Sequence, residues 1–567
     1  MTESVEGSQR EWRERPWIMA AVGAAGGLLV HLLSDGLTYY PLPTTGTILR
    51  QSAAAGIGIA TVTFLITAER RRLAWAAAFA IAWGLIMALV GYSTGSYGRG
   101  GELVEFPFLS GLLAIAVASP LFQTLRDEGR KALPYQQVHR YAWTDAIIGG
   151  ASLAFTGLTF LLAFLLGALF DAIGIPVLKE LLDEGWFAWM LAGGAFGSAS
   201  AVLREKDPLL GTLQRLVMLV FSVLAPVLAG ALAVYFIALP ITGFGGLWKS
   251  GLPETPLLLA TAAFAVVFLN AIIGDSPDDR SGGRLWRITE GVLLFSVLPL
   301  GALALVSMSM RVGQYGWTPE RLWGVIACLI AIAYGLAAWI AAVRDRQGFD
   351  VRLRENQKAL AIGLCGLALF LALPIVDFGA ISTRSQLARL ESGKVAANEF
   401  DWGALKYDFG PAGLAALKRY AASGSGEERK LAGETLRLDN RYEVERAVAA
   451  DKRAETLETY VEVASPDIVL TDGLRRNIAN MRECGKHMQC KLFRLDEHRL
   501  VLLTVSNLTN GLDRLILDER KFDGVAEKSY PQQDAKGLDM ARVTIEVRDV
   551  PTKQVFVNGQ AVGDPFE

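Results

Sequence analysis

Histidine and cysteine are both scarce in this sequence. The 567 residues include four cysteines and four histidines, and the histidines (His31, His139, His487 and His498) are scattered between the predicted compartments. A Ser-His-Asp triad or a histidine-rich zinc site needs such residues together, so neither can be proposed. No glycine-rich phosphate loop opens a helix in the polar C-terminal part of the chain. We therefore predict neither a metal nor a cofactor.

Charge is also limited, and it is unevenly placed. Charged residues make up 20% of the chain against 52% hydrophobic residues, and the formal net charge is -2. This balance gives no reason to expect a nucleic-acid partner. Residues 16–377 contain long uncharged runs, whereas residues 378–567 have the composition of a soluble domain. We place a domain boundary near Asp377.

The uncharged runs are long enough to cross a membrane as helices. A bilayer core about 30 Å thick needs roughly 20 apolar residues per helix. The sequence thus predicts eleven spans, at about residues 16–34, 51–68, 73–92, 105–124, 143–170, 186–203, 212–240, 255–274, 286–308, 320–343 and 357–376. The span at 186–203 is rich in Gly, Ala and Ser, which favours close helix packing. The span at 212–240 is long and contains Pro226, which favours tilt or a kink.

Lysine and arginine predict the orientation, because cytoplasmic loops carry an excess of both. One set of alternating loops is rich in them, with Arg10, Arg13 and Arg15; Arg70, Arg71 and Arg72; Arg126, Arg130, Lys131 and Arg140; Arg204, Lys206 and Arg215; Arg280, Arg284 and Arg287; and Arg344, Arg346, Arg352, Arg354 and Lys358. The other set holds Arg50, Arg99, Lys179, Lys249, Arg311 and Arg321. We expect a bacterial inner-membrane protein with a cytoplasmic N-terminus and, after eleven spans, a periplasmic C-terminal domain. One span more or fewer would leave that domain in the cytoplasm.

The C-terminal tail has two parts. Residues 382–460 carry helical patterns, including GPAGLAALKRYAA and NRYEVERAVAADKRAETLETYVEV, and residues 489–562 change to the alternation of strands. The predicted fold is a polytopic α-helical membrane protein with about 11 transmembrane helices and a C-terminal extracytoplasmic α+β domain. Its predicted parts are a cytoplasmic tail (1–15), a transmembrane helical domain (16–377), a helical segment (378–464) and a mainly β domain (465–567).

The sequence YGWTPER precedes the tenth predicted span. Thr318 is suited to cap the helix, Pro319 to its first position and Glu320 to its positive end. A functional alternative is that Arg311, Tyr315 and Arg321 receive an anionic lipid or solute at the outer face.

Two stretches resemble a known family. RVGQYGWTPERLWGV at 311–325 and the stretch from Ile381 to Ala421 are similar to the bacterial membrane family called domain of unknown function 4153. The second stretch holds a Phe-Asp…Leu…Phe-Gly pattern. The resemblance covers the membrane part to about residue 421 and implies many spans with an exported helical segment. It implies no chemistry, because the family has no assigned activity.

Polar side chains inside the spans are candidates for a transport or ligand site. Glu290, Asn270 and Asp145 lie near the predicted cytoplasmic ends of their spans. Polar and ionisable groups in a membrane are costly and often mark a pathway. For Glu290 the alternative is a surface pair with Arg287, three residues earlier.

Asp35 ends the first span at the predicted outer face. Multi-span glycosyltransferases that use lipid-linked sugars carry an acidic residue in their first outer loop as catalytic base. The first outer loop here is shorter than in those enzymes, and the alternative is a capping Asp at a helix end.

Cys484 and Cys490 lie six residues apart in the polar tail. In an oxidising compartment this spacing predicts a disulfide that closes a small loop. Two alternatives are a Cu(I) or zinc site that includes His487 and Met488, and free thiols.

Three functions fit these patterns. The first is a transport- or permease-like membrane protein with an exported accessory domain. The second is an envelope enzyme that acts on a lipid-linked substrate through Asp35. The third is a sensor or scaffold whose exported domain binds an envelope protein. The expected partners are the lipid bilayer and such an envelope protein, and the sequence favours a non-enzymatic role.

Overall fold

A computed structural model describes most of the chain. The described residues are 12–36, 44–95, 102–129, 133–205, 207–243, 253–274, 283–345, 348–446, 456–481, 484, 488–506, 512–518, 527–529, 545–550, 552–557 and 559–566. The chain divides into two compact units, Met1–Leu431 and Ala432–Glu567.

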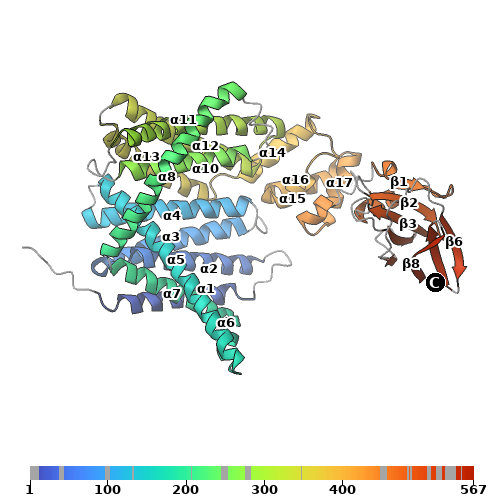
Figure 1. Ribbon diagram of the computed structural model, residues 1–567, viewed down its shortest axis with the longest axis horizontal. Coiled ribbons are helices and arrows are strands. Elements are labelled where there is room, and N and C mark those ends of the chain that lie inside the picture. Colours follow the sequence, from blue (N-terminus) through green and yellow to red (C-terminus); the bar gives the residue numbers. More distant parts are fainter. Residues whose placement is uncertain are drawn as a thin grey trace, which may run out of the picture. The chain divides into compact units, whose positions relative to one another are not determined.

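The first unit is helical (Figure 1). Its longer helices are α1 (Arg15–Ser34), α2 (Thr45–Thr67), α3 (Leu73–Gly95), α4 (Glu102–Glu128), α5 (Tyr135–Ala172), α7 (Gly185–Glu205), α8 (Asp207–Thr242), α10 (Glu254–Ile273), α11 (Arg284–Tyr315), α12 (Pro319–Arg344) and α13 (Phe349–Ala372). The short helices η1 (Arg70–Arg72) and α6 (Val177–Asp183) lie between them. Among the described residues, ten helices are long and apolar enough to cross a membrane. The chain is therefore a multi-pass membrane protein.

Helix α13 is not among those ten. Its first half carries the charged residues Asp350, Arg352, Arg354, Glu355 and Lys358. It coincides with the eleventh predicted span, so the crossing of this helix stays a prediction.

The two longest helices, α5 and α8, run diagonally across the others (Figure 1). They have 38 and 36 residues. At 1.5 Å per residue they are about 57 and 54 Å long, whereas a bilayer core is about 30 Å thick. Tilt is the usual response of a helix that exceeds the bilayer thickness, as the sequence predicts for residues 212–240.

Helices α1 and α7 pack through glycines. A Cβ atom added at Gly193 of α7 would lie 2.0 Å from the carbonyl oxygen of Gly23 on α1, and one at Gly197 would lie 2.2 Å from that of Met19. Only glycine permits such an approach of two backbones. The close packing predicted for the small-residue span at 186–203 is confirmed.

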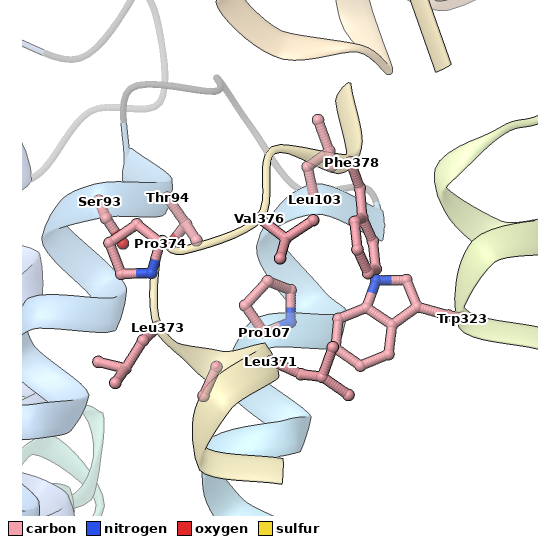
Figure 2. Close-up of a pocket in the computed structure, with 11 residues that line it drawn as sticks. Ser93, Thr94, Leu103, Pro107, Trp323, Leu371, Leu373, Pro374, Val376 and Phe378 are labelled. Atoms are coloured by element: carbon pink, nitrogen blue, oxygen red, sulfur yellow. The ribbon is translucent and has the colours of Figure 1, made fainter. Parts of the chain in front are cut away.

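Helices α14 (Phe378–Glu391), α15 (Trp402–Tyr407) and α16 (Gly410–Ser423) follow, and α17 (Gly426–Arg437) comes next. The chain between α13 and α14 packs against membrane helices around a cavity of about 30 Å³. Figure 2 shows Phe378 of α14 beside Trp323 of α12, and their ring centroids are 5.3 Å apart. The compositional change near Asp377 thus lies inside the first compact unit, which continues to Leu431.

The second unit contains two sheets. The larger has the strand order β1 (Val461–Val463), β2 (Met488–Arg494), β3 (Arg499–Ser506), β4 (Leu512–Asp518) and β5 (Glu527–Ser529), and the smaller has β6 (Ile545–Val550), β7 (Thr552–Val557) and β8 (Gln560–Phe566). Strands β1 and β2 are parallel, and the other pairs are antiparallel. The strands predicted in this region are therefore present. The helical pattern predicted through Val463 is wrong at its end, because Val461–Val463 pairs with β2.

The larger sheet is covered on both faces. Leu492 and Leu502 pack with Leu474 and Ile478 of helix α19 (Asp472–Met481) and with residues near the short helix η3 (Leu457–Thr459). Residues on the opposite face pack against β7 and β8 of the smaller sheet. Cys484 and Cys490 form a disulfide on the α19 side, as predicted. His487, from the alternative metal site, lies outside the described residues.

Candidate functional site

The turn between α11 and α12 has a well-defined local structure. Helix α11 ends at Gly316, whose φ of 77° suits glycine, and its N–H donates to Val312 O at 2.8 Å. Thr318 Oγ1 accepts a hydrogen bond from the backbone N–H of Arg321 at 3.4 Å, and Pro319 begins α12. The helix start predicted from YGWTPER is confirmed.

Side chains of α14 hold this turn. Gln386 Nε2 donates to the carbonyl oxygens of Tyr315 and Trp317, each at 2.9 Å. Arg389 Nη2 donates to Gln314 O at 2.7 Å. The last carbonyls of a helix have no partner within the helix, and here α14 supplies donors for them. We call this contact the α14 clamp.

A cavity of about 370 Å³ lies beside the clamp. Its lining comes from both the membrane helices and the segment that follows them. Six of the lining residues are charged, namely Arg321 and Arg389 with positive charge, and Glu320, Glu399, Asp401 and Asp408 with negative charge. Small-molecule sites commonly have volumes of about 300–1,000 Å³ with a few convergent polar groups. The size and lining of this outer cavity, as we call it, fit a binding site for a small polar molecule.

The two arginines differ in how they are held. Arg321 Nη1 donates to Gly316 O at 2.7 Å and to Tyr315 O at 3.2 Å, and its guanidinium lies 5.4 Å from the centroid of the Tyr315 ring. Arg389 Nε is buried without a hydrogen-bond acceptor among the described residues. A buried donor without an acceptor costs about 1–3 kcal/mol. The Arg389 guanidinium therefore has one N–H group, Nε–H, that makes no hydrogen bond within the described structure.

Helices α15 and α16 are built around the Phe-Asp…Leu…Phe-Gly pattern. Asp401 Oδ1 accepts from Ala404 N at 3.0 Å and caps α15. Phe400, Leu405 and Phe409 are buried. Gly410 begins α16 with a φ of 63°. The pattern therefore shapes the segment that brings Asp401 and Asp408 to the cavity.

Comparison with known proteins identifies the family. A family model described as domain of unknown function (DUF4153) matches residues 53–420. The chain belongs to this family. No curated protein matches the chain, and no solved structure matches it. The matched range contains every charged residue of the outer cavity, so this site lies within the part that defines DUF4153 proteins.

The outer-face residues predicted from the sequence separate in the DUF4153 structure. Tyr315 and Arg321 line the outer cavity. Arg311 instead pairs with Glu254 of α10 at 2.6 Å. Asp35 is an exposed residue at the end of α1, and its backbone carbonyl accepts from Arg50 at 2.8 Å. Asp35 is thus not among the residues of this cavity.

At the other end of the helices, three arginines surround the C-terminus of α2. They donate to three successive carbonyls: Arg204 to Ile66 O, Arg126 to Thr67 O at 2.6 Å, and Arg15 to Ala68 O at 2.7 Å. Cations are favourable at a helix C-terminus, where carbonyls lack partners. This arginine cluster ties α1, α4 and α7 to α2.

Asp145 belongs to the same cluster. Its Oδ1 lies 3.8 Å from Arg204 Nη1, and Gln123 Nε2 of α4 donates to its Oδ2. Arg204 also donates to Gln123. These contacts give Asp145 a structural role as counter-charge to a buried arginine.

Asn270 lies in a separate polar chain. Its Oδ1 accepts from Gln357 Nε2 of α13 at 2.7 Å, and Gln357 Oε1 accepts from the Tyr135 hydroxyl at 3.1 Å. Tyr135 also lies 3.2 Å from His139 Nδ1, so the chain joins α5, α10 and α13. We call these four residues the inner polar chain.

Glu290 is inside the helical bundle. It is 2% exposed, whereas Arg287 is exposed. A surface pair with Arg287 does not describe this buried position.

Asp145 and Asn270 belong to two distinct sites. The described partners of Asp145 are on α4 and α7, whereas the partner of Asn270 is on α13.

Sequence reasoning missed Arg389, Glu399 and Asp408 as site residues. They are charged side chains in a segment of ordinary soluble composition. The one available signal was the Phe-Asp…Leu…Phe-Gly pattern, which encloses Asp401 and Asp408 but does not reveal that they face α12.

Proposed function

We propose that this DUF4153 protein is a transport- or permease-like protein of the bacterial inner membrane, with the outer cavity as its extracytoplasmic substrate site. The observation that carries this proposal is the mixed origin of the cavity. Arg321 and Glu320 come from membrane helix α12, whereas Arg389, Glu399 and Asp408 come from the segment after α13. A ligand there would contact the membrane helices and the exported helices at once.

The orientation rests on the loops. Lysine and arginine gather on alternate loops, which favours a cytoplasmic N-terminus. If α13 crosses as an eleventh span, the cavity and the second unit are on the periplasmic side. The Cys484–Cys490 disulfide supports an oxidising compartment for the second unit.

Buried and half-buried polar groups near the predicted cytoplasmic end support a transport role. The inner polar chain and Glu290 lie within helices α5, α10, α11 and α13. Such groups are costly within a membrane and commonly line substrate or proton routes. The protein would thus offer polar sites near both membrane faces.

A second candidate function is sensing, which the α14 clamp favours. A segment fixed to the α11–α12 turn by Gln386 and Arg389 can pass a signal into the membrane helices. Deletion of residues 432–567 separates the two functions. A transporter retains solute uptake without the second unit, whereas a sensor that binds its partner through this unit loses its response.

Alkaline phosphatase fusions test the orientation. A fusion after Asp377 should be active, because the enzyme matures in the periplasm, and a fusion after Leu73 should be inactive. An inactive fusion at Asp377 with an active one at Leu73 would reverse the proposed orientation.

Uptake into proteoliposomes tests transport. The purified protein is reconstituted and offered a mixture of labelled amino acids, sugars, carboxylates and amines. We expect accumulation of one chemical class above that in empty liposomes, lost in Arg321→Gln and retained in Arg384→Gln. Arg384 is an exposed residue of α14 that is not among the lining residues. Accumulation of no class above empty liposomes would contradict a transport role.

A further inference from the structure

We propose that the outer cavity binds a small zwitterion, a molecule that carries both an ammonium group and a carboxylate or phosphate. This inference rests on the proposed function, whose substrate class it names. Arginines alone would indicate an anion, as the sequence suggests for Arg321. The cavity adds four carboxylates to two guanidinium groups, so an anion alone does not match its lining.

The charges come from different elements. The guanidinium groups belong to α12 and α14, whereas three of the four carboxylates belong to the segment 399–408 around α15. An ammonium group is recognised by carboxylates, and a carboxylate or phosphate by a guanidinium fork. A ligand with both groups would therefore bridge α15 to α12 and α14.

Arg389 supplies a second guanidinium for the anionic group. One of its nitrogens, Nη2, is used by Gln314 O, and its buried Nε is closed to solvent and therefore to a ligand. The side chain nevertheless lines the cavity. A carboxylate or phosphate of the ligand would be attracted by the positive charge that Arg389 places there.

Glu399 supplies a carboxylate for the ammonium group of the ligand. It is an exposed residue of the turn before α15, and it lines the cavity. An ammonium group that approaches from the solvent can reach such a carboxylate without displacing a helix cap. Asp401 is less available to bind an ammonium group, because its Oδ1 already accepts a hydrogen bond from Ala404 N.

Two sources share this chemistry. One is a soluble molecule such as an α-amino acid, and the other is the phosphoethanolamine headgroup of a bilayer lipid. The cavity volume of about 370 Å³ accommodates either.

Binding to the full-length protein tests the proposal. Thermal unfolding in detergent is measured with L-alanine, L-lysine and O-phosphoethanolamine as zwitterions, and with propionate, ethylamine and glycerol as matched probes. We expect at least one zwitterion to raise the unfolding temperature, while propionate and ethylamine, which each lack one charge, do not. Unfolding in nanodiscs of phosphatidylethanolamine and of phosphatidylglycerol tells the lipid source from the soluble one.

Two variants locate the binding. Glu399→Gln should weaken zwitterion binding about tenfold or more, the effect of losing one charge-assisted contact. Glu427→Gln, an exposed change in α17, should leave it unchanged. Because Glu399 is exposed, its substitution should leave folding intact, and the unfolding temperature without ligand checks this.

The outcomes separate the two proposals. The zwitterion site would be overturned if ethylamine alone or propionate alone stabilised the protein. It would also be overturned if none of the zwitterions and neither lipid stabilised it. If a zwitterion binds but no proteoliposome uptake is seen, the site stands and transport fails. If uptake of another class depends on Arg321, transport stands and the zwitterion site fails.

Discussion

At the residue scale, arginines in this protein serve two different purposes. In the arginine cluster they are buried and donate to backbone carbonyls of α2. In the outer cavity, Arg321 and Arg389 hold the turn and also face open space. Arginine suits both tasks because it stays charged and presents five donors. The same residue type that predicts orientation from the sequence therefore also stabilises the fold.

Arg126→Gln should destabilise the first unit. Arg126 is 7% exposed and pairs with Asp127 as well as with Thr67 O. The shorter amide would leave the buried Thr67 carbonyl without its donor and would remove the Arg126 bonds to Asp127, which keeps only the bond from the Tyr141 hydroxyl among its hydrogen bonds in the described structure, at a cost of about 2–4 kcal/mol. Thermal unfolding in detergent measures this, and the exposed change Arg140→Gln serves as control. Equal unfolding temperatures in both variants would contradict the role of the cluster.

Asp496 should make the β2–β3 hairpin sensitive to acid. Partial desolvation acts to raise its pKa, but bonds from His498 N, from Arg499 N and from the Arg499 guanidinium lower the pKa overall. A lowered folded pKa gives stability that is present above the unfolded value, about 3.9, and is lost as the pH falls through the folded value.

Amide exchange of residues 488–506 measures this effect. Each variant is compared with the wild type at the same pH. Asp496→Asn should exchange faster than wild type near pH 7, and this difference should shrink as the pH falls through the lowered folded pKa of Asp496, where the wild-type carboxylate becomes protonated. Glu497→Gln, an exposed change in the same turn, should match the wild type at each pH. If Asp496→Asn still exchanged faster than the wild type by the same factor in acid, the ionised Asp496 carboxylate would not be the source of the stability.

At the element scale, helix α1 depends on α7. Gly23 and Gly193 place the two backbones in contact, and Gly197 extends that contact. Membrane helices lack a strong hydrophobic force between them, so close backbone packing is a main source of their association. The first half of the membrane part is thus held by shape as well as by the arginine cluster.

Gly193→Ala should disrupt this contact. The new Cβ would lie 2.0 Å from Gly23 O, and the helices would have to separate. Overpacking of this kind commonly costs about 1–3 kcal/mol. Gly150→Ala in α5, where no atom lies within 4 Å of an added Cβ, is the matched control. The unfolding temperature should fall in the first variant alone, and an unchanged value would argue against the observed packing.

At the scale of the whole molecule, the chain comprises two units with different sources of stability. The first unit buries apolar and polar groups between helices, and the second relies on a sandwiched sheet with one disulfide. Local stabilities can differ widely within one chain. A change within one unit should therefore leave the other intact.

Removal of the disulfide should affect the second unit alone. The double change Cys484→Ser and Cys490→Ser removes a constraint whose typical value is about 2–4 kcal/mol. Limited proteolysis should then degrade residues 432–567 faster, while a fragment that ends near Leu431 persists. Equal protection of both units in the variant would contradict this division. Reductant applied to the wild type should reproduce the effect.

The sequence by itself determined the membrane class, nearly all of the spans, the disulfide and the start of α12. These features follow from local composition and spacing, such as long apolar runs or the order Thr318, Pro319, Glu320. The family was also recognisable from such local stretches, and the matched range confirms it. The small residues of the span at 186–203 predicted that α7 packs closely against a neighbouring helix. They did not predict that this neighbour is α1.

The tertiary structure alone decided which residues meet. Arg321 and Glu399 are far apart in the sequence, and nothing in either neighbourhood shows that α14 returns to the α11–α12 turn. Likewise Asn270 finds Gln357, and Asp145 finds Arg204, through helix packing. The physical reason is that a local pattern sets the type of an element, whereas contacts between distant elements depend on how all the helices pack together.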